Sequence, residues 1–252
     1  ADVLRKTLEE LAVECSILKV AGSEMLDYVL DENVQIHGGN GFVKDYAAER
    51  HYRDSRVNRI FEGTNEINRL LIPGTLVRRA LKDRLPLIAE ARRLQDEIMN
   101  PPTLPEDSDA PLSDQVRSVG AFKKTAVMVL GLAMQRYGEK LTDEQEVLSW
   151  AADILIDTFA ADSAVVRALQ ASTDAPTTAL LQQDAASIYV NDAAGRIEAA
   201  AKSALATMAE GDDLRLNLAA LRRLLKVTPV NTVVRRRRLA DAVVGRAGYT
   251  LN

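Results

Sequence analysis

Cysteine and histidine are scarce in this chain of 252 residues. Cys15 is the single cysteine and there are two histidines. One thiol cannot close an internal disulfide, and the sequence holds no Cys/His cluster at zinc-ligand spacing. We therefore expect no metal site. A chain without disulfides is typical of a reducing compartment, so the predicted location is cytoplasmic.

Aromatic and turn-forming residues are also few. Aromatics make up 4% of the chain, with Gly 13 and Pro 8, whereas hydrophobic residues reach 47% and charged residues 27%. A β-sandwich or barrel normally requires more aromatic and β-branched residues and more turns. The chain is too apolar to be disordered. The composition predicts an all-α protein with a sizeable core.

Long apolar runs are absent as well. No stretch approaches the ~20 residues of a membrane span, and the charged first residues show no signal peptide. The formal net charge of -4 argues against bulk binding to nucleic acid. The sequence has no initiator methionine, and its first residues already follow a helical pattern, so we expect a fragment or a processed chain.

Helical spacing covers most of the first hundred residues. It predicts helices over residues 2–30, 48–60, 65–71 and 76–99. The first should stop near Asp31, and Pro73 and Gly74 should interrupt the third. Thr64 can cap the helix that begins after it.

A proline-rich stretch then divides the chain. Four prolines and several acids over residues 101–111 exclude a regular element and predict a linker. Residues 112–252 show long amphipathic patterns, typical of antiparallel helices with short connections. We therefore predict a helical bundle over residues 1–100 and a second helical bundle, an extension domain, over residues 112–252.

The hexamer that begins at Phe61 is the first candidate for chemistry. Glu62 stands in a non-helical turn between an aromatic residue and Gly63. Burial raises the pKa of a carboxyl and makes it a better general base. A glycine after it lets a ligand approach the backbone. The alternative, which the hexamer taken alone favours, is a simple corner between helices.

The glycines at positions 38, 39 and 41 also have two interpretations. Consecutive backbone N–H groups in a tight turn can bind an anion such as a phosphate. An ordinary helix stop has the same composition, and in isolation it is the favoured interpretation.

Three linked blocks strongly resemble the C-terminal region of the acyl-CoA dehydrogenases. They are QIHGGNGF at 35–42, ERHYRDSRV at 49–57 and RIFEGTNEINRLLI at 59–72. Their order and spacing match, and the resemblance extends upstream through residues 22–24 and 14–16 to cover roughly residues 1–80.

The resemblance implies an FAD enzyme that converts acyl-CoA to trans-2-enoyl-CoA, the dehydrogenation step of fatty-acid β-oxidation. It makes Glu62 the catalytic base and places Phe61 and Gly63 at the substrate. It also implies a homodimer, and an electron-transferring flavoprotein as acceptor. The positions implied for FAD binding are Thr64 and Glu66 and, reaching the flavin of a neighbouring subunit, Gln35, Gly38 and Gly39.

The family fold also includes an amino-terminal helical domain and a middle β-barrel, and no stretch of residues 1–252 indicates a barrel. We therefore expect the later part of a longer enzyme, which in isolation neither retains FAD nor turns over. An extension like residues 112–252 is similar to those of very-long-chain and bacterial members, which suggests longer acyl substrates.

Two alternatives stay open. The helices could form a non-catalytic module for dimerisation or docking. The run from Arg235 to Arg238 could meet an anionic membrane surface. A solvated helix face with intramolecular salt bridges is the favoured interpretation of the arginines.

Overall fold

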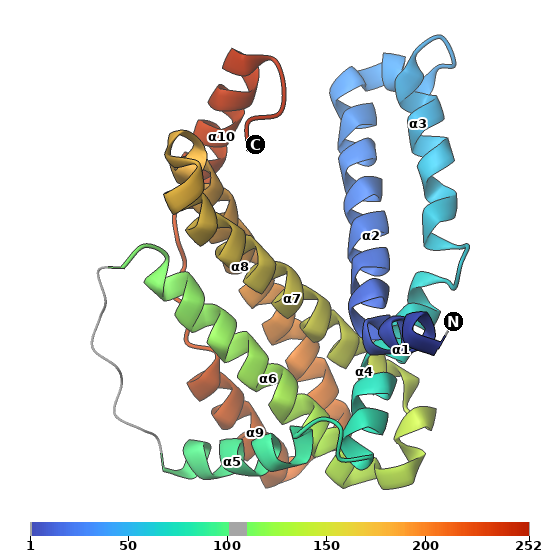
Figure 1. The fold of residues 1–252 in the computed structure, drawn as a ribbon, viewed down its shortest axis with the longest axis vertical. Coiled ribbons are helices and arrows are strands. Elements are labelled where there is room, and N and C mark those ends of the chain that lie inside the picture. Colours follow the sequence, from blue (N-terminus) through green and yellow to red (C-terminus); the bar gives the residue numbers. More distant parts are fainter. Residues whose placement is uncertain (1, 101–109, 252) are drawn as a thin grey trace. The chain divides into compact units, whose positions relative to one another are not determined.

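The chain is helical throughout the part that the structure covers. The computed structural model describes residues 2–100 and 110–251, which contain α- and 3₁₀-helices and no β-strand (Figure 1). The all-α prediction is confirmed. Within the same residues, no helix combines the length and the apolar character needed to cross a bilayer. The chain divides into two compact units, residues 1–79 and 80–252.

The first unit is built around a helical hairpin. The helix α2 runs to the 3₁₀-helix η1, and α3 returns along α2 in the opposite direction (Figure 1). A Cβ atom at Gly41 would clash with the carbonyl of Val34, so only glycine lets the chain fold back this closely. The elements are α1 (Asp2–Glu10), α2 (Ala12–His37), η1 (Gly38–Phe42), α3 (Ala47–Arg56), η2 (Val57–Arg59) and α4 (Asn65–Leu81).

Two predicted helix ends in this unit are wrong. α2 passes Asp31 and stops only where Gly38 takes a φ of 57°. The acidic residues near Asp31 are tolerated within a helix, whereas the left-handed φ is what terminates it. α4 passes Pro73 and continues to Leu81. A proline removes one helical hydrogen bond, and the complete burial of Ile72 beside it offsets that loss.

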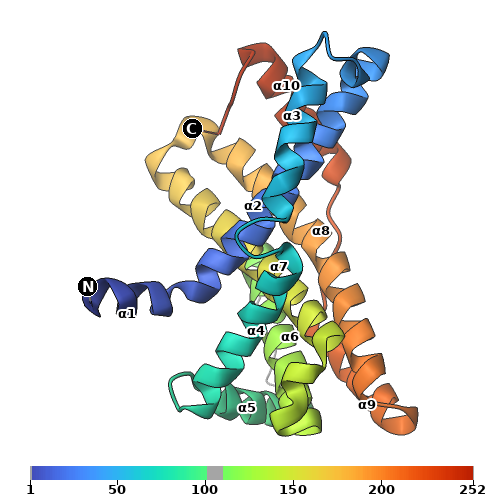
Figure 2. The same ribbon diagram turned by 90° about the vertical axis from the view of Figure 1, so that its right-hand side faces the viewer.

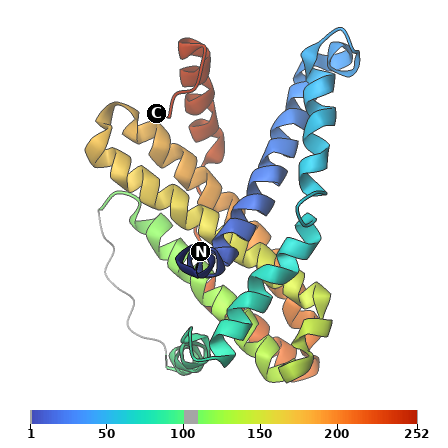
Figure 3. The same cartoon turned by 45° about the vertical axis from the view of Figure 1, so that its right-hand side comes forward.

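The second unit is a bundle around one long antiparallel pair. α7 and α8 meet at Ala175 and lie side by side (Figure 2), with Pro176 at the first position of α8. α6 packs on both, and α10, red in Figure 3, contacts α8. The elements are α5 (Leu87–Met99), α6 (Ser113–Tyr137), η3 (Gly138–Asp143), α7 (Gln145–Asp174), α8 (Pro176–Met208), α9 (Gly211–Leu224) and α10 (Thr232–Arg246).

The core of this bundle mixes large and very small side chains. Phe122, Leu130 and Ile154 are almost completely buried. Alanines on α7 and α8 are equally buried and have no bulk beyond Cβ, so the two helices can approach closely. These alanines are Ala152, Ala161, Ala168, Ala193, Ala201 and Ala204.

The helix α5 belongs to the second unit, not to the first as the predicted division at residue 100 implied. Its Leu87 and Leu94 are buried, and a Cβ at Gly131 of α6 would lie 2.7 Å from the side chain of Ala91. Helical periodicity shows that a helix has an apolar face but not which bundle covers that face. The predicted linker falls largely on residues 101–109, which lie outside the described residues.

An ion pair between the buried Asp157 and the half-exposed Arg196 joins α7 to α8. Arg196 donates to both oxygens of Asp157, at 2.9 Å to Oδ2 and 2.6 Å to Oδ1, and the Tyr189 hydroxyl donates to Oδ1 at 3.1 Å. Burial, together with the charge of Asp157, raises the pKa of Tyr189 to about 12. The phenol therefore stays protonated and donates to the carboxylate at any physiological pH.

The arginine run lies on α10 and is largely paired with acids of α8. Arg235 donates to Oδ1 of the fully buried Asp184 at 2.7 Å, and Nε of Arg238 lies 2.8 Å from Oδ2. Arg236 pairs with Asp192. Intramolecular pairing reduces the positive charge that the run can present to an anionic membrane. This favours the salt-bridge interpretation of the run.

We expect Asp184→Asn to loosen α10. The change removes the buried carboxylate that pairs with two partly exposed guanidinium groups, and losing a hydrogen bond to a charged group costs about 1.5–3 kcal/mol. Trypsin should then cleave faster at the arginines of α10. Asp241→Asn, an exposed position on the same helix, is the control and should be cleaved like the wild type. Equal cleavage of all three proteins would show that Asp184 does not anchor α10.

Candidate functional site

The candidate base stands on a strained turn between η2 and α4. Glu62 has a φ of 54° and Gly63 a φ of 78°. The left-handed region suits glycine but costs a residue with a side chain about 1–2 kcal/mol. The side chains of Glu62 and Phe61 are exposed. Thr64 ends the turn as the predicted cap, because its Oγ1 accepts the N–H of Ile67 at 3.2 Å.

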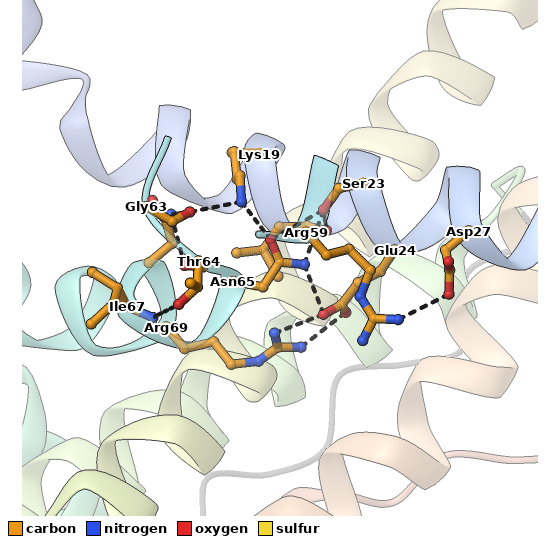
Figure 4. Close-up of polar contacts among 12 residues, drawn as sticks. Lys19, Ser23, Glu24, Asp27, Arg59, Gly63, Thr64, Asn65, Ile67 and Arg69 are labelled. Carbon is orange, nitrogen blue, oxygen red and sulfur yellow. Dashed lines mark hydrogen bonds and ion pairs between the residues drawn. The ribbon is translucent and has the colours of Figure 1, made fainter. Parts of the chain in front are cut away.

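Lys19 of α2 connects this turn to the helical hairpin (Figure 4). Its Nζ donates to the Gly63 carbonyl at 2.8 Å and to Oδ1 of Asn65 at 2.7 Å. The Gly63 carbonyl also accepts from Nδ2 of Asn68 at 2.9 Å. The turn that carries Glu62 is therefore held from two sides, by α2 and by the first turns of α4.

Asn65, the first residue of α4, is fully buried, and its side chain contacts α2. Its Nδ2 donates to Ser23 Oγ at 2.9 Å and to Glu24 Oε1 at 3.1 Å. Arg69, one turn further along α4, donates to both oxygens of Glu24 at 2.7 and 2.9 Å (Figure 4). Every polar group of the buried amide thus has a partner, as burial requires.

The charge of Glu24 is stabilised by these partners. Burial by itself would raise the pKa of Glu24, but the hydrogen bonds and charge of Arg69, with the amide of Asn65, lower it below the ordinary value of 4.5. A two-pronged Arg–carboxylate contact is among the stronger polar contacts in proteins. The Glu24 carboxylate therefore connects α2 to α4 through its hydrogen bonds with Asn65 and Arg69.

Glu66 is exposed in the first turn of α4. A hydrogen bond from its own backbone N–H lowers the pKa of Glu66, burial acts slightly in the opposite direction, and the Thr64 hydroxyl adds to the lowering. A carboxylate near a helix N-terminus is also favoured by the helix dipole. Glu66 is thus an anion, available at the edge of the turn.

The structure brings some of the predicted site residues together and separates the others. Residues 61–66 share one turn and the start of α4, while Gln35, Gly38 and Gly39 are exposed at the opposite end of α2 (Figure 1). Lys19 and Gln35 are separated by about 24 Å along the helix at 1.5 Å per residue. One chain therefore presents two separate clusters.

Gly38 ends α2 and is also open to a ligand. Its N–H donates to the carbonyl of Gln35, as expected of a helix stop. A Cβ added at Gly38 or Gly39 would meet no atom within 4 Å, so the backbone of this turn is accessible. The two interpretations of the glycines are therefore compatible with each other.

Sequence reasoning missed the residues that support the turn. Lys19, Asn65 and Arg69 had no predicted role, and Ser23 and Glu24 entered only as part of a resemblance. The spacing held a partial signal, since Lys19 and Ser23 lie one helical turn apart and present polar groups on the same face. Among the described residues, no group of acids, histidines and cysteine could hold a metal ion.

Two family models match this chain, and both describe the C-terminal domain of acyl-CoA dehydrogenases. One covers residues 3–76 and the other residues 121–223. The chain belongs to the acyl-CoA dehydrogenase family. The second match places the helical extension within the same family, beyond the roughly eighty residues that carried the resemblance.

Individual relatives agree with this assignment. The chain is 45% identical over 254 residues to a probable acyl-CoA dehydrogenase of Bacillus subtilis, with 98% of this chain and 42% of the relative covered. It is 42% identical over 66 residues to subunit CarC of the caffeyl-CoA reductase-Etf complex of Acetobacterium woodii, with 26% of this chain and 17% of that protein covered.

A solved structure agrees as well. The acyl-CoA dehydrogenase of Bacillus anthracis complexed with FAD has a TM-score of 0.92 and 45% identity, over 97% of this chain and 41% of that one. The similarity confirms the fold of the C-terminal region. The chain spans about 42% of the length of the Bacillus subtilis relative.

We expect the Glu24–Arg69 pair to stabilise the chain only while Glu24 is ionised. Because the pKa of Glu24 is lower in the folded chain than in the unfolded one, its contribution is present above 4.5 and is lost as the pH falls through the folded pKa. Glu24→Gln should lower the free energy of unfolding by about 1 kcal/mol at neutral pH, and the difference from wild type should vanish in acid.

Denaturant unfolding at several pH values measures this difference. Glu32→Gln, an exposed position on the same helix, is the matched control and should follow the wild type throughout. A Glu24→Gln deficit that stayed constant as the solution was acidified would contradict the assigned role of the carboxylate.

Proposed function

We propose that this chain is the C-terminal part of an FAD-dependent acyl-CoA dehydrogenase in which Glu62 is the catalytic base. The observation that carries the proposal is the placement of Glu62 on a strained, anchored turn while its carboxylate remains exposed. Nearby Glu24 is bound by Arg69 and Asn65. Among the contacts of the described residues, none engages the Glu62 carboxylate, so it is available for proton transfer.

The proposed step removes two hydrogens from an acyl-CoA thioester. Glu62 takes the proton from the α carbon and becomes a carboxylic acid. FAD, when bound, supplies the acceptor for the hydride that leaves the β carbon, and the α,β double bond of the trans-2-enoyl-CoA forms from the remaining electrons. Phe61 and Gly63, on either side of the base, are the residues placed to border the acyl chain and the thioester.

The residues present fit the proposed cofactor. The backbone at Gly38 and Gly39 is open to a large ligand, and Gln35 beside it offers an exposed amide. The ionised carboxylate of Glu66 would repel phosphate. We therefore assign Thr64 and Glu66 to hydroxyl or N–H groups of FAD and the glycine turn to a different part of the cofactor.

The distance between the two clusters supports a dimer in this proposal. With about 24 Å of helix between them, Gln35, Gly38 and Gly39 would reach the flavin of a neighbouring subunit while Thr64 and Glu66 serve their own. The electron acceptor is proposed to be an electron-transferring flavoprotein, because a relative is a subunit of a reductase-Etf complex. A role in fatty-acid β-oxidation, a preference for longer acyl chains and a cytoplasmic location remain predictions.

A specific observation favours a second candidate function, a helical docking module. Leu18, Met25, Val29 and Ile36 recur along α2 and are all at least half exposed, and Phe42 at the end of the hairpin is 82% exposed. Exposed apolar side chains in such number mark a surface that another protein segment covers. This function is compatible with the enzyme proposal, which also requires partners for the first unit.

Glu62→Gln in the full-length, flavin-loaded enzyme tests the proposal. The amide has nearly the shape of the carboxylate but cannot accept the proton, so turnover of saturated acyl-CoA thioesters should fall by at least about 100-fold. The flavin content and the visible absorbance of bound flavin should be unchanged. The assay is anaerobic bleaching of the flavin by a series from butyryl-CoA to palmitoyl-CoA.

Glu90→Gln is the matched control, since it changes a half-exposed glutamate of the second unit that pairs with Arg93. It should turn over like the wild type. Bleaching by Glu62→Gln at a rate close to that of the control would reject the assignment of the base.

A further inference from the structure

We propose that Lys19 is a positioning residue for the reaction: its ammonium group, presented by α2, sets the direction of the turn that carries Glu62. The inference rests on the proposed function of Glu62. It concerns a residue that does not itself reach the substrate.

The contacts of Lys19 span the turn. Its Nζ donates to the carbonyl of Gly63 at 2.8 Å and to the side chain of Asn65 at 2.7 Å, one acceptor on each side of Thr64 (Figure 4). Hydrogen bonds from a charged donor are shorter and stronger than neutral ones. A single half-buried ammonium group thus fixes the peptide between Gly63 and Thr64, directly after the strained pair Glu62–Gly63, and the first residue of α4.

The backbone at Glu62 needs such support. Glu62 adopts a φ of 54°, which a residue with a side chain rarely takes, and Gly63 continues at 78°. Strained conformations persist only where the surroundings hold them. The Gly63 carbonyl accepts from Asn68 as well. Asn68 lies in α4, the helix that begins directly after the turn, so this contact is local and does not connect the turn to another helix. Lys19 donates from another helix, and so it relates the turn to the hairpin.

The placement of a base decides the rate of proton transfer more than the affinity for substrate. A displacement of about 1 Å can cost roughly 100-fold in rate. Without the Lys19 contact, we expect the turn to sample other conformations, so that the carboxylate is less often in line with the α C–H bond. Substrate contacts made elsewhere would be unaffected.

The test compares Lys19→Met with wild type in the full-length, flavin-loaded enzyme. Methionine keeps the length of the side chain but donates no hydrogen bond. We expect kcat to fall at least tenfold with KM within about twofold, and the isotope effect for α-deuterated acyl-CoA to increase because proton removal becomes slower. Lys19→Arg, which can still donate to both acceptors, should recover most of the lost rate.

Asp27→Asn is the matched control. Asp27 is also on α2 and holds the preceding segment through Arg59, with 2.9 Å between Oδ2 and the guanidinium. Asp27→Asn weakens the ion pair between α2 and Arg59 but leaves the hydrogen bond from Lys19 to the Gly63 carbonyl intact. We therefore expect kcat to stay close to wild type. Amide hydrogen exchange over residues 60–66 should accelerate in Lys19→Met and not in Asp27→Asn.

The outcomes separate this inference from the proposed function. If Glu62→Gln loses turnover while Lys19→Met keeps a wild-type kcat and isotope effect, the positioning role is overturned and the base assignment survives. If Glu62→Gln keeps turnover, the proposed function fails first. If Lys19→Met loses its flavin or fails to fold, Lys19→Leu, which also donates no hydrogen bond, decides: a lowered kcat with full flavin content supports the role, and an unchanged kcat overturns it.

Discussion

The first unit depends on one buried amide. Asn65 begins α4 and is fully buried, and the hydrogen-bond partners of its side chain are Lys19, Ser23 and Glu24 of α2. A buried amide left without partners costs about 1–3 kcal/mol. Few alternative registers of α4 against α2 would keep all three contacts. The contacts of Asn65 with α2 therefore place Thr64 and the turn before it at a defined position along the hairpin.

Two glutamates close to these contacts have different environments. Glu24 is half-buried, ionised and bound by Arg69, so its carboxylate contributes to packing. Glu62 is exposed and carries its strain in the backbone. Strain at a residue that is held by its neighbours is typical of functional sites. Together with the family assignment, this contrast supports the proposal that Glu62 is the base, while Glu24 holds α2 and α4 together.

The second unit is held together differently. Its core is apolar and rich in alanine, and two buried carboxylates join the long helices to each other and to α10. Asp157 accepts hydrogen bonds from Arg196 and Tyr189, whereas Asp184 accepts one from Arg235 and forms an ion pair with Arg238. Three of the four arginines that could have bound lipid therefore form ion pairs with acids of α8. A separate model of the acyl-CoA dehydrogenase C-terminal domain matches residues 121–223, which lie within this compact unit.

Local sequence patterns, which involve residues close together in the chain, were sufficient to predict several features of this structure. The all-α class and the cap at Thr64 follow from local chemistry. The glycines at 38–41 were recognised as a helix stop, although the helix before them was wrongly predicted to end near Asp31. The sequence could not tell that α4 continues past Pro73 or that α5 joins the second unit, because those outcomes depend on burial against distant segments. Nor could it assign Lys19, whose bond to Gly63 spans 44 positions of the chain. Contacts of that kind exist only once the helices have packed.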